Sequence, residues 1–528
     1  MKDNYTYLSK FILLFFINTL FFCILVYLLP LSFEENDDAV MCMIASGAYS
    51  GTPDAHLVFI NYLYGLVLVF LYKTFHNIEW YTVSFCGIHI LSLSIIFYKF
   101  VKLNKPLLLK ILFILLLYAV EVGIILAFQF TTTAAIGAFA GALLLLEKKR
   151  QYQIFGIFLF LIAALVRFDA AMLVLLLMLP LFIYEILLNK SIALKISIPV
   201  VICICTSALL QLTDNQIYKS DAEWGYYKKY NSIRGKINDN PNAKSITNDL
   251  PEGVTQNDYL LLLKFFPDGQ TINLQKIEQL GKLIQRTPFV KKITNISLSR
   301  YKTELVIISL LFILCFLGEK QKKKKYFLLI YFVFIIGVLS FISLDGEVKN
   351  RVLVTTLFPV FFFLYYYSPP FRNKILAYSF VGILLFFSLF FINETNNNRK
   401  RLIGKVKYVA DNQLPLMNEA KNLNVKVVPF AGDFSIEVYC SPFKVKETFS
   451  KYPIYFAGWL TNIPLNKGHF DSYMSFVDSD VSIFTKIESE PLYSSIIQKA
   501  LIEHYDCNAA FVELCRNDYY LLFQFKRN

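Results

Sequence analysis

The feature that most constrains this chain is a series of long apolar runs that recur from near its start to about residue 393. Several of them reach the roughly 20 apolar residues that a helix needs to cross the hydrocarbon core of a bilayer. The 528 residues are 56% hydrophobic, and the mean hydropathy of +0.50 lies above the range of soluble domains. We therefore predict a polytopic α-helical membrane protein with about 11 crossings. The runs fall at 11–31, 57–72, 80–98, 107–128, 131–146, 154–166, 171–188, 192–212, 304–318, 326–344, 352–367 and 375–393.

Basic residues gather in several of the short loops between these runs, and Lys and Arg favour the cytoplasmic side of a membrane. We therefore predict a cytoplasmic N-terminus and a C-terminal region outside the cytoplasm, with alternating runs from 107 onward. Two runs disturb this order, because the first loop is expected outside and Lys99–Lys105 inside. Either 57–72 or 80–98 is then a re-entrant or incomplete span, or Lys99–Lys105 departs from the charge rule. The other basic loops are Glu147–Arg150, Asn189–Lys195, Lys320–Lys325 and Arg372–Lys374.

Most of the net charge of +13 comes from basic residues in these short loops. Such residues set the topology and contact lipid phosphates. We therefore expect the lipid bilayer as a partner and no nucleic acid. The sequence gives no indication of the oligomeric state.

Two polar regions divide the chain. Residues 213–303 form an aromatic-rich insertion between apolar runs, and residues 394–528 follow the last run after a linker-like segment, Asn396–Arg401. We predict a transmembrane domain over 1–393, which includes a first outer loop at 32–56 and the insertion, and a small extracytoplasmic α/β domain over 394–528. Its predicted strands are Val425–Phe430, Ser435–Cys440, Val481–Thr485, Ala509–Leu514 and Tyr519–Phe525, and its predicted helix is Ser494–Tyr505.

An acidic cluster, Glu34-Glu35-Asn36-Asp37-Asp38, stands where the chain leaves the first apolar run. Carboxylates at this interface can take a proton from a hydroxyl or hold a divalent cation such as Mg²⁺ or Mn²⁺. We take Asp37 and Asp38 as catalytic candidates and as the candidate metal ligands. The structural alternative is that they stabilise the N-terminus of an interfacial helix over 39–48.

The rest of the first loop adds three supporting candidates. Glu35 belongs to the acidic cluster, and Asp54 and His56 lie in a tight turn that leads to the next apolar run. For His56, capping of the turn is the alternative to sugar binding.

Charged residues also interrupt the apolar pattern at two later turns. Arg167 and Asp169 break a long apolar stretch, where charges default to a functional or pairing role. Asp345, Lys349 and Arg351 lie between two strong runs, at headgroup level, where an Arg fork binds phosphate well. The structural alternatives are an Arg–Asp pair that caps a hairpin and a connector with snorkelling side chains.

These features together resemble the GT-C superfamily of membrane glycosyltransferases, which use polyprenyl-phosphate-linked sugars. That family has an acidic motif in its first outer loop, where Glu34–Asp38 stands here. Its members often carry an outer Arg-x-Asp/Glu in a mid-chain hairpin, as in Arg167-Phe168-Asp169, and a basic residue in a late outer loop, like Arg351. A C-terminal extracytoplasmic domain is common among them.

The resemblance implies an inverting transfer of a sugar to a cell-surface glycan or glycolipid at the outer face. Asp37 or Asp38 would serve as the general base or hold the cation, and Asp169 would orient Arg167. The donor phosphate would be bound by the basic residues Arg167, Lys349 and Arg351. The composition, rich in Lys, Asn, Ile and Phe, favours a bacterial inner membrane and undecaprenyl phosphate as the carrier.

Two other functions remain open at this stage. A polysaccharide polymerase or ligase would rely on arginines of the insertion, such as Arg234 and Arg286. A transporter or flippase of lipid-linked sugars would rely on charges inside the spans, where Glu121 and Glu185 are found.

Overall fold

The computed structural model describes residues 2–188, 193–240, 243, 250–284, 301–344, 348–371, 373–430 and 432–528. This part of the chain is mostly helical, and seven of its helices are long and apolar enough to cross a membrane. The prediction of a multi-pass helical protein is therefore confirmed. The seven are α1 (Lys2–Leu28), α4 (Trp80–Lys102), α5 (Leu107–Leu126), α8 (Phe168–Leu188), α9 (Ala193–Ser220), α15 (Lys322–Ser343) and α17 (Lys374–Asn412).

Four shorter apolar helices complete the bundle, and one of them, α6, is its centre. Fifteen of the 16 residues of α6 are buried, all but Thr131. Its small residues allow close packing: a Cβ added at Gly141 would lie 2.8 Å from the backbone oxygen of Gly156 on α7. The four helices are α6 (Phe130–Leu145), α7 (Arg150–Val166), α14 (Lys302–Gly318) and α16 (Asn350–Tyr367).

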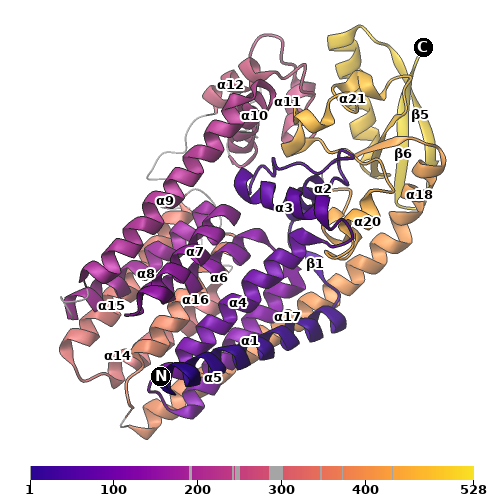
Figure 1. Cartoon of the computed structure of the whole chain (residues 1–528). Helices are drawn as coiled ribbons and strands as arrows, with labels where there is room; N and C mark the ends of the chain where they lie inside the picture. The colour runs from indigo at the N-terminus through magenta and orange to yellow at the C-terminus, as the bar shows by residue number, and fades with distance from the viewer. Residues whose placement is uncertain are drawn as a thin grey trace.

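The run at 57–72 forms the shorter helix of the two runs that disturb the charge pattern. It forms α3 (Tyr62–Thr74), whose 13 residues span only about 20 Å, and which packs beside the first outer loop (Figure 1). In contrast, α4 has 23 residues and extends to Lys99 and Lys102, which both pair with Glu147. Of the two runs, 80–98 is therefore the one whose helix is long and apolar enough to cross a membrane.

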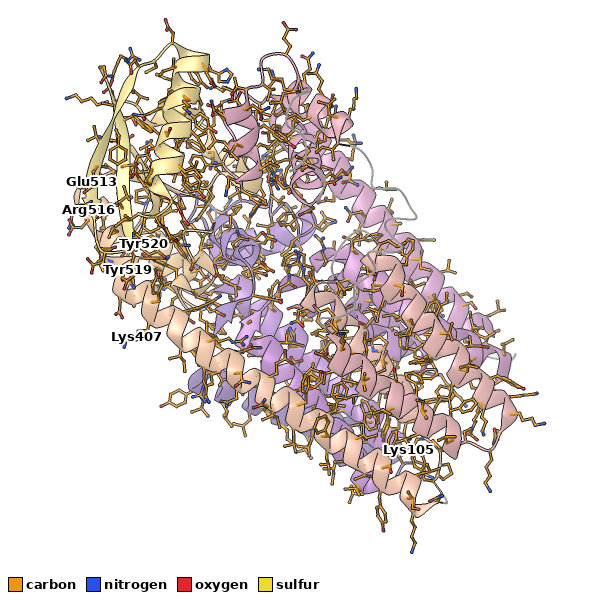
Figure 2. All side chains as sticks on the ribbon, turned by 180° about the vertical axis from the view of Figure 1, so that it is seen from behind. Lys105, Lys407, Glu513, Arg516, Tyr519 and Tyr520 are labelled. Carbon is orange, nitrogen blue, oxygen red and sulfur yellow. The ribbon has the colours of Figure 1, made fainter. Side chains whose placement is uncertain are left out.

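The bundle has a basic end and a cap end. At the basic end Lys99 bonds Glu147 at 2.6 Å, and Lys105 donates to the backbone oxygen of Ser368 at 2.7 Å. Figure 2 shows Lys105 at this end, far from Tyr519 and Tyr520 at the other. The cap end carries the first outer loop, the insertion and the C-terminal domain (Figure 1).

The first outer loop is fixed to the bundle by a short parallel pairing of β1 (Ser32–Phe33) with β2 (Ala127–Phe128). It continues as α2 (Asn36–Ser46), which ends at Gly47 with a φ of 82°. A Cβ at Gly47 would lie 2.7 Å from Pro53, so glycine is required there. The described part of the insertion forms α10 (Ala222–Asn238), α11 (Gln256–Leu263) and α12 (Leu274–Leu283).

The C-terminal domain is a four-stranded sheet with helices, in the order β3-β4-β6-β5. β3 pairs with β4 in parallel, and the other pairs are antiparallel. Two predictions fail here: Ser435–Cys440 contains a short helix rather than a strand, and Asn396–Arg401 continues the helix α17 instead of forming a linker. The elements are α18 (Leu414–Asn422), β3 (Lys426–Pro429), α19 (Ile436–Tyr439), α20 (Val445–Phe449), η4 (Gly458–Leu460), η5 (Pro464–Asn466), η6 (Tyr473–Phe476), β4 (Val481–Lys486), α21 (Glu490–Tyr505), β5 (Ala509–Arg516) and β6 (Tyr520–Arg527).

The insertion and the C-terminal domain pack together into one cap. The ring of Phe266 in the insertion stacks on Phe430 at 3.8 Å, and Phe430 stacks on Tyr493 at 3.9 Å. The buried carboxylate of Asp268 accepts hydrogen bonds from the Tyr473 amide and the Tyr505 hydroxyl, each at 2.8 Å. The two polar regions that the sequence separates therefore form a single cover over the first outer loop.

Candidate functional site

The acidic cluster begins α2, and its two aspartates occupy different environments. Asp38 is fully buried, and its Oδ1 accepts hydrogen bonds from the Tyr81 hydroxyl at 2.9 Å and the Phe130 amide at 3.0 Å. Burial raises the pKa of Asp38 well above its usual range. Asp38 therefore anchors α2 to α4 and α6, and of the two predicted catalytic carboxylates it is the one closed to solvent.

Asp37 is only partly buried and faces basic residues from three separate elements. Burial raises its pKa to about 6, and Glu35 adds to that effect, while Arg351, Arg167 and Arg234 oppose it. A carboxylate with a pKa near 6 is ionised at neutral pH and is a better base than an ordinary aspartate. Asp37 is thus the member of the acidic cluster suited to proton transfer.

The predicted phosphate-binding residues meet at the rim of one cavity of about 800 Å³, here called the lateral cavity. Arg167, Lys349 and Arg351 form its polar end together with Thr131 and Asp169. Its walls come from α8, α15 and α16, and the lining residues Leu176 and Phe341 are exposed on the surface. The apolar lining consists of Ala170, Met172, Leu173, Leu176, Phe334, Gly337, Val338, Phe341, Ile342 and Val352.

Two of the three cations of this rim, Arg351 and Arg167, are held in place by carboxylates. Arg351 makes a 3.5 Å ion pair with Glu35, both partly exposed. Arg167 ends α7, pairs with the exposed Asp169 at 3.3 Å, and lies over the ring of Phe130 at 5.4 Å. Both the pairing expected for Arg167 and its placement at the rim are therefore present, and such fixed guanidinium groups suit an incoming anion.

A second cavity, of about 420 Å³ and here called the polar cavity, lies on the other side of α16. It is bounded by α5, α17 and the first outer loop, and Thr132 and Asn350 line it but not the lateral cavity. Its polar lining carries both signs of charge and several amide and hydroxyl groups. These residues are Ser32, Glu34, Thr132, Asn350, Glu394, Thr395, Asn398, Arg401, Lys405 and Glu437.

Asp54 and His56 form a docking contact for the insertion. The Oδ1 atom of Asp54 is 2.7 Å from both the amide nitrogen and Nδ1 of His56. The His56 ring stacks on Trp224 of α10 at 4.2 Å. His56 is thus held between Asp54 and Trp224, and these contacts join the first outer loop to the insertion.

A divalent cation does not fit the described residues well. They contain no group of three or more His, Cys, Asp or Glu side chains that could hold a metal. Asp38 already uses Oδ1, so its Oδ2 and the Asp37 carboxylate would be the ligands, and Mg²⁺ prefers six oxygens. The predicted supporting residue Asp345 lies outside the described residues.

Sequence reasoning missed the residues that fix the site. Tyr81 and the Phe130 amide hold Asp38 from 43 and 92 positions away, and no local pattern indicates such contacts. Gln129 caps α6 by accepting from the amides of Thr131 and Thr132. A polar residue at the start of an apolar run is a recognisable cap signal, and Gln129 could have been found by it.

No protein-family model matches this chain, and no curated protein matches it.

Proposed function

We propose that this protein is an integral-membrane glycosyltransferase that moves a sugar from a polyprenyl-phosphate-linked donor to a glycan or glycolipid acceptor. The observation that carries the proposal is the lateral cavity, which combines apolar walls with a rim of three cations. Those are the two environments that a lipid tail and its phosphate require. Asp37, with its raised pKa, stands beside the same rim.

The proposed reaction is a single displacement at the anomeric carbon. The acceptor hydroxyl attacks that carbon, Asp37 takes the hydroxyl proton, and the bond from carbon to the phosphate oxygen breaks. The configuration inverts, and polyprenyl phosphate leaves with the additional negative charge. Arg351, Lys349 and Arg167 stabilise this charge because they are already in place at the rim. Proton transfer by a positioned carboxylate contributes roughly 10²–10⁴-fold in rate.

The polar cavity is the proposed acceptor side. Carboxylates, amides and guanidinium groups at its wall can exchange hydrogen bonds with sugar hydroxyls. Thr131 lines one cavity and Thr132 the other, so a donor and an acceptor would meet across the first turn of α6.

The topology that goes with this function has about 11 crossings, formed by α1, α4 to α9 and α14 to α17. In that arrangement the N-terminus and the basic end are cytoplasmic, and the cap and both cavities face outward. The cell membrane of a bacterium is the proposed location, and undecaprenyl phosphate is the proposed carrier.

The alternative functions gain less from the geometry. Arg234 is 7% exposed, and its guanidinium donates to Asn231 and Asn238 of its own helix. It is therefore poorly placed to bind a polymer. Arg286, the other arginine of that hypothesis, lies outside the described residues. Glu121 is paired with His89, and Glu185 accepts from the Tyr366 hydroxyl, so these two in-span charges do not line a transport path among the described residues.

The experiment that tests the proposal compares surface glycans by mass spectrometry in cells that lack the gene and in cells complemented with variants. Loss of one sugar branch that the wild-type gene restores, and that Asp37→Asn does not, would support the proposal. Asp518→Asn, an exposed carboxylate in the cap, is the matched control and should restore the branch. Lipid-linked single units with a loss of polymer length would instead indicate a polymerase, and unchanged glycans would overturn transfer altogether.

A further inference from the structure

The polar pair of Glu121 and His89 lies inside the bundle, where the proposed reaction does not use it. Glu121 on α5 and His89 on α4 are both 0% exposed, and His89 Nδ1 is 2.5 Å from Glu121 Oε1. Ionisable groups at this depth are costly and are kept where they pair with a specific partner for a function. The other oxygen of Glu121 has no hydrogen-bond partner among the described residues.

The second ring nitrogen of His89 leads to α6. Its Nε2 is 3.0 Å from the hydroxyl oxygen of Thr133, and that hydroxyl donates to the backbone oxygen of Gln129 at 3.0 Å. A carbonyl oxygen can only accept a hydrogen bond, so the hydroxyl hydrogen of Thr133 is donated to Gln129. The Thr133 oxygen can then only accept a hydrogen bond from His89. Nε2 of His89 therefore carries a proton, and the bond has a defined direction from α4 to α6.

The turn held in this way contacts Asp38 and contributes one residue to each of the two cavities. Gln129 and Thr133 bracket the first turn of α6, and the Phe130 amide between them donates to Asp38 at 3.0 Å. In the same turn Thr131 lines the lateral cavity and Thr132 the polar cavity. A shift of this turn would move the anchor of α2, and with it Asp37, as well as the wall between the cavities.

We propose that His89 and Glu121 are positioning residues that fix the first turn of α6 and thereby set the place of Asp37, which precedes the anchored Asp38 in the first turn of α2. This inference rests on the proposed function for its catalytic consequence, although the positioning itself does not. Glu121 orients the imidazole through Nδ1, the imidazole holds Thr133 through Nε2, and Thr133 holds the turn. Rates depend steeply on such placement, because small displacements of a reacting group are costly.

The test uses full-length protein in nanodiscs and the pair Thr133→Val and Thr133→Ser. Valine has nearly the shape of threonine but cannot accept from His89, whereas serine can. The matched control is Ser92→Ala, a buried hydroxyl on the same helix as His89 with no hydrogen-bond partner among the described residues. Amide hydrogen exchange of 36–46 and 129–135 is measured together with transfer from a polyprenyl-phosphate sugar.

Thr133→Val should speed exchange in both segments at least severalfold and lower kcat about tenfold, with the donor KM changed less than twofold. Thr133→Ser and Ser92→Ala should resemble the wild type in both measurements. Unchanged exchange and kcat in Thr133→Val would overturn the inference. If the wild type shows no transfer but Thr133→Val still speeds exchange, the positioning holds and the proposed function fails.

If Thr133→Val does not fold, His89→Gln replaces it, because the glutamine amide can donate to Thr133 without the bond to Glu121. Exchange faster than wild type and slower turnover are expected for His89→Gln. Wild-type values for both would reject the role of Glu121 in orienting the imidazole.

Discussion

The lateral cavity and the polar cavity lie on opposite sides of α16 and differ in almost every property. The lateral cavity is walled by apolar side chains, and its charges are confined to one rim. The polar cavity carries carboxylates, amides and cations over much of its surface. Apolar walls lower the free energy of an alkyl chain by removing it from water, whereas mixed polar walls give no such advantage and suit a hydroxylated ligand.

One helix end therefore contributes to two cavities of different character. Residues at the start of α16 alternate between the cavities, with Arg351 and Val352 on the lateral side and Asn350 and Val354 on the polar side. The helix periodicity produces this division, because residues one or two positions apart point in different directions. Asp37 lies near the cations of the lateral side, since both Arg351 and Arg167 act on its carboxylate.

The largest expected effect is the loss of transfer in Asp37→Asn. The amide cannot take the acceptor proton, so the rate should fall by roughly 10²–10⁴-fold in an assay with purified protein and donor lipid. The thermal midpoint should stay equal or rise at pH 7.5, because a half-buried charge is removed.

Asp38 provides the contrast within the same helix. Asp38→Ala leaves the Tyr81 hydroxyl and the Phe130 amide without their partner and should destabilise the fold by roughly 1–3 kcal/mol. An Asp38→Ala variant with wild-type stability and activity would contradict the role of Asp38 as an anchor. An Asp37→Asn variant with wild-type activity would contradict the role of Asp37 as the general base.

Arg351→Ala should weaken the donor side alone. Loss of one charge-assisted contact to a phosphate is worth about 1.5–3 kcal/mol, or roughly ten- to hundredfold in donor KM or in kcat/KM for the donor. The measurement is a donor titration at saturating acceptor. Lys426→Ala, a cation of the C-terminal domain that pairs with Asp480, is the control and should leave the donor KM unchanged. An equal effect on the acceptor KM would contradict the separation of the two cavities.

The parts of the fold that the sequence predicted are those that depend on residues close together in the chain. The spans and the strands β3, β4, β5 and β6 follow from apolar runs and β-branched residues, and they were predicted. Asn396–Arg401 was misread because polarity was taken as flexibility; the segment has no Gly or Pro to end a helix, so α17 continues through it. Ser435–Cys440 was misread because a short apolar run does not distinguish strand from helix.

The site shows the same limit. The sequence placed Arg167, Lys349 and Arg351 on one surface through topology, and the structure brings them to one cavity; their role toward a donor stays a prediction. The separate roles of Asp37 and Asp38 could not be read, because burial of Asp38 depends on Tyr81 and Phe130 from distant helices. Partners of that kind follow only from tertiary packing.

Filling the lateral cavity should impair the donor side through its apolar wall. Gly337 of α15 lines the cavity, and an added Cβ there meets no atom within 4 Å. Gly337→Phe should therefore fold and raise the donor KM about tenfold, because one ring displaces several buried methylenes of the lipid tail. Gly382→Phe on α17, also in open space, is the matched control outside both cavities. Equal donor KM values in the two variants would argue against a lipid tail in the lateral cavity.

The pH profile of transfer should report the ionisation of Asp37. Its pKa of about 6 lies above the ordinary value, so the proton is lost only as pH rises through 6. Transfer, which needs the carboxylate, should be near its plateau at pH 7.5 and fall to about a tenth at pH 5. The control is the same profile for Arg351→Ala, in which the lost cation no longer lowers the pKa, so the midpoint should move upward. A flat wild-type profile between pH 5 and 7.5 would contradict Asp37 as the base.

The smallest effect is expected on the acceptor side, where many weak contacts share the binding. Arg401 and Lys405 line the polar cavity from α17, and both side chains are exposed. Because exposed polar contacts contribute little each, Arg401→Ala should raise the acceptor KM only about two- to fivefold and leave the donor KM unchanged. Arg399→Ala, two residues earlier on the same helix and outside the cavity, is the matched control. A rise in the donor KM instead would mean that the polar cavity serves the donor, and the assignment of the two cavities would have to be reversed.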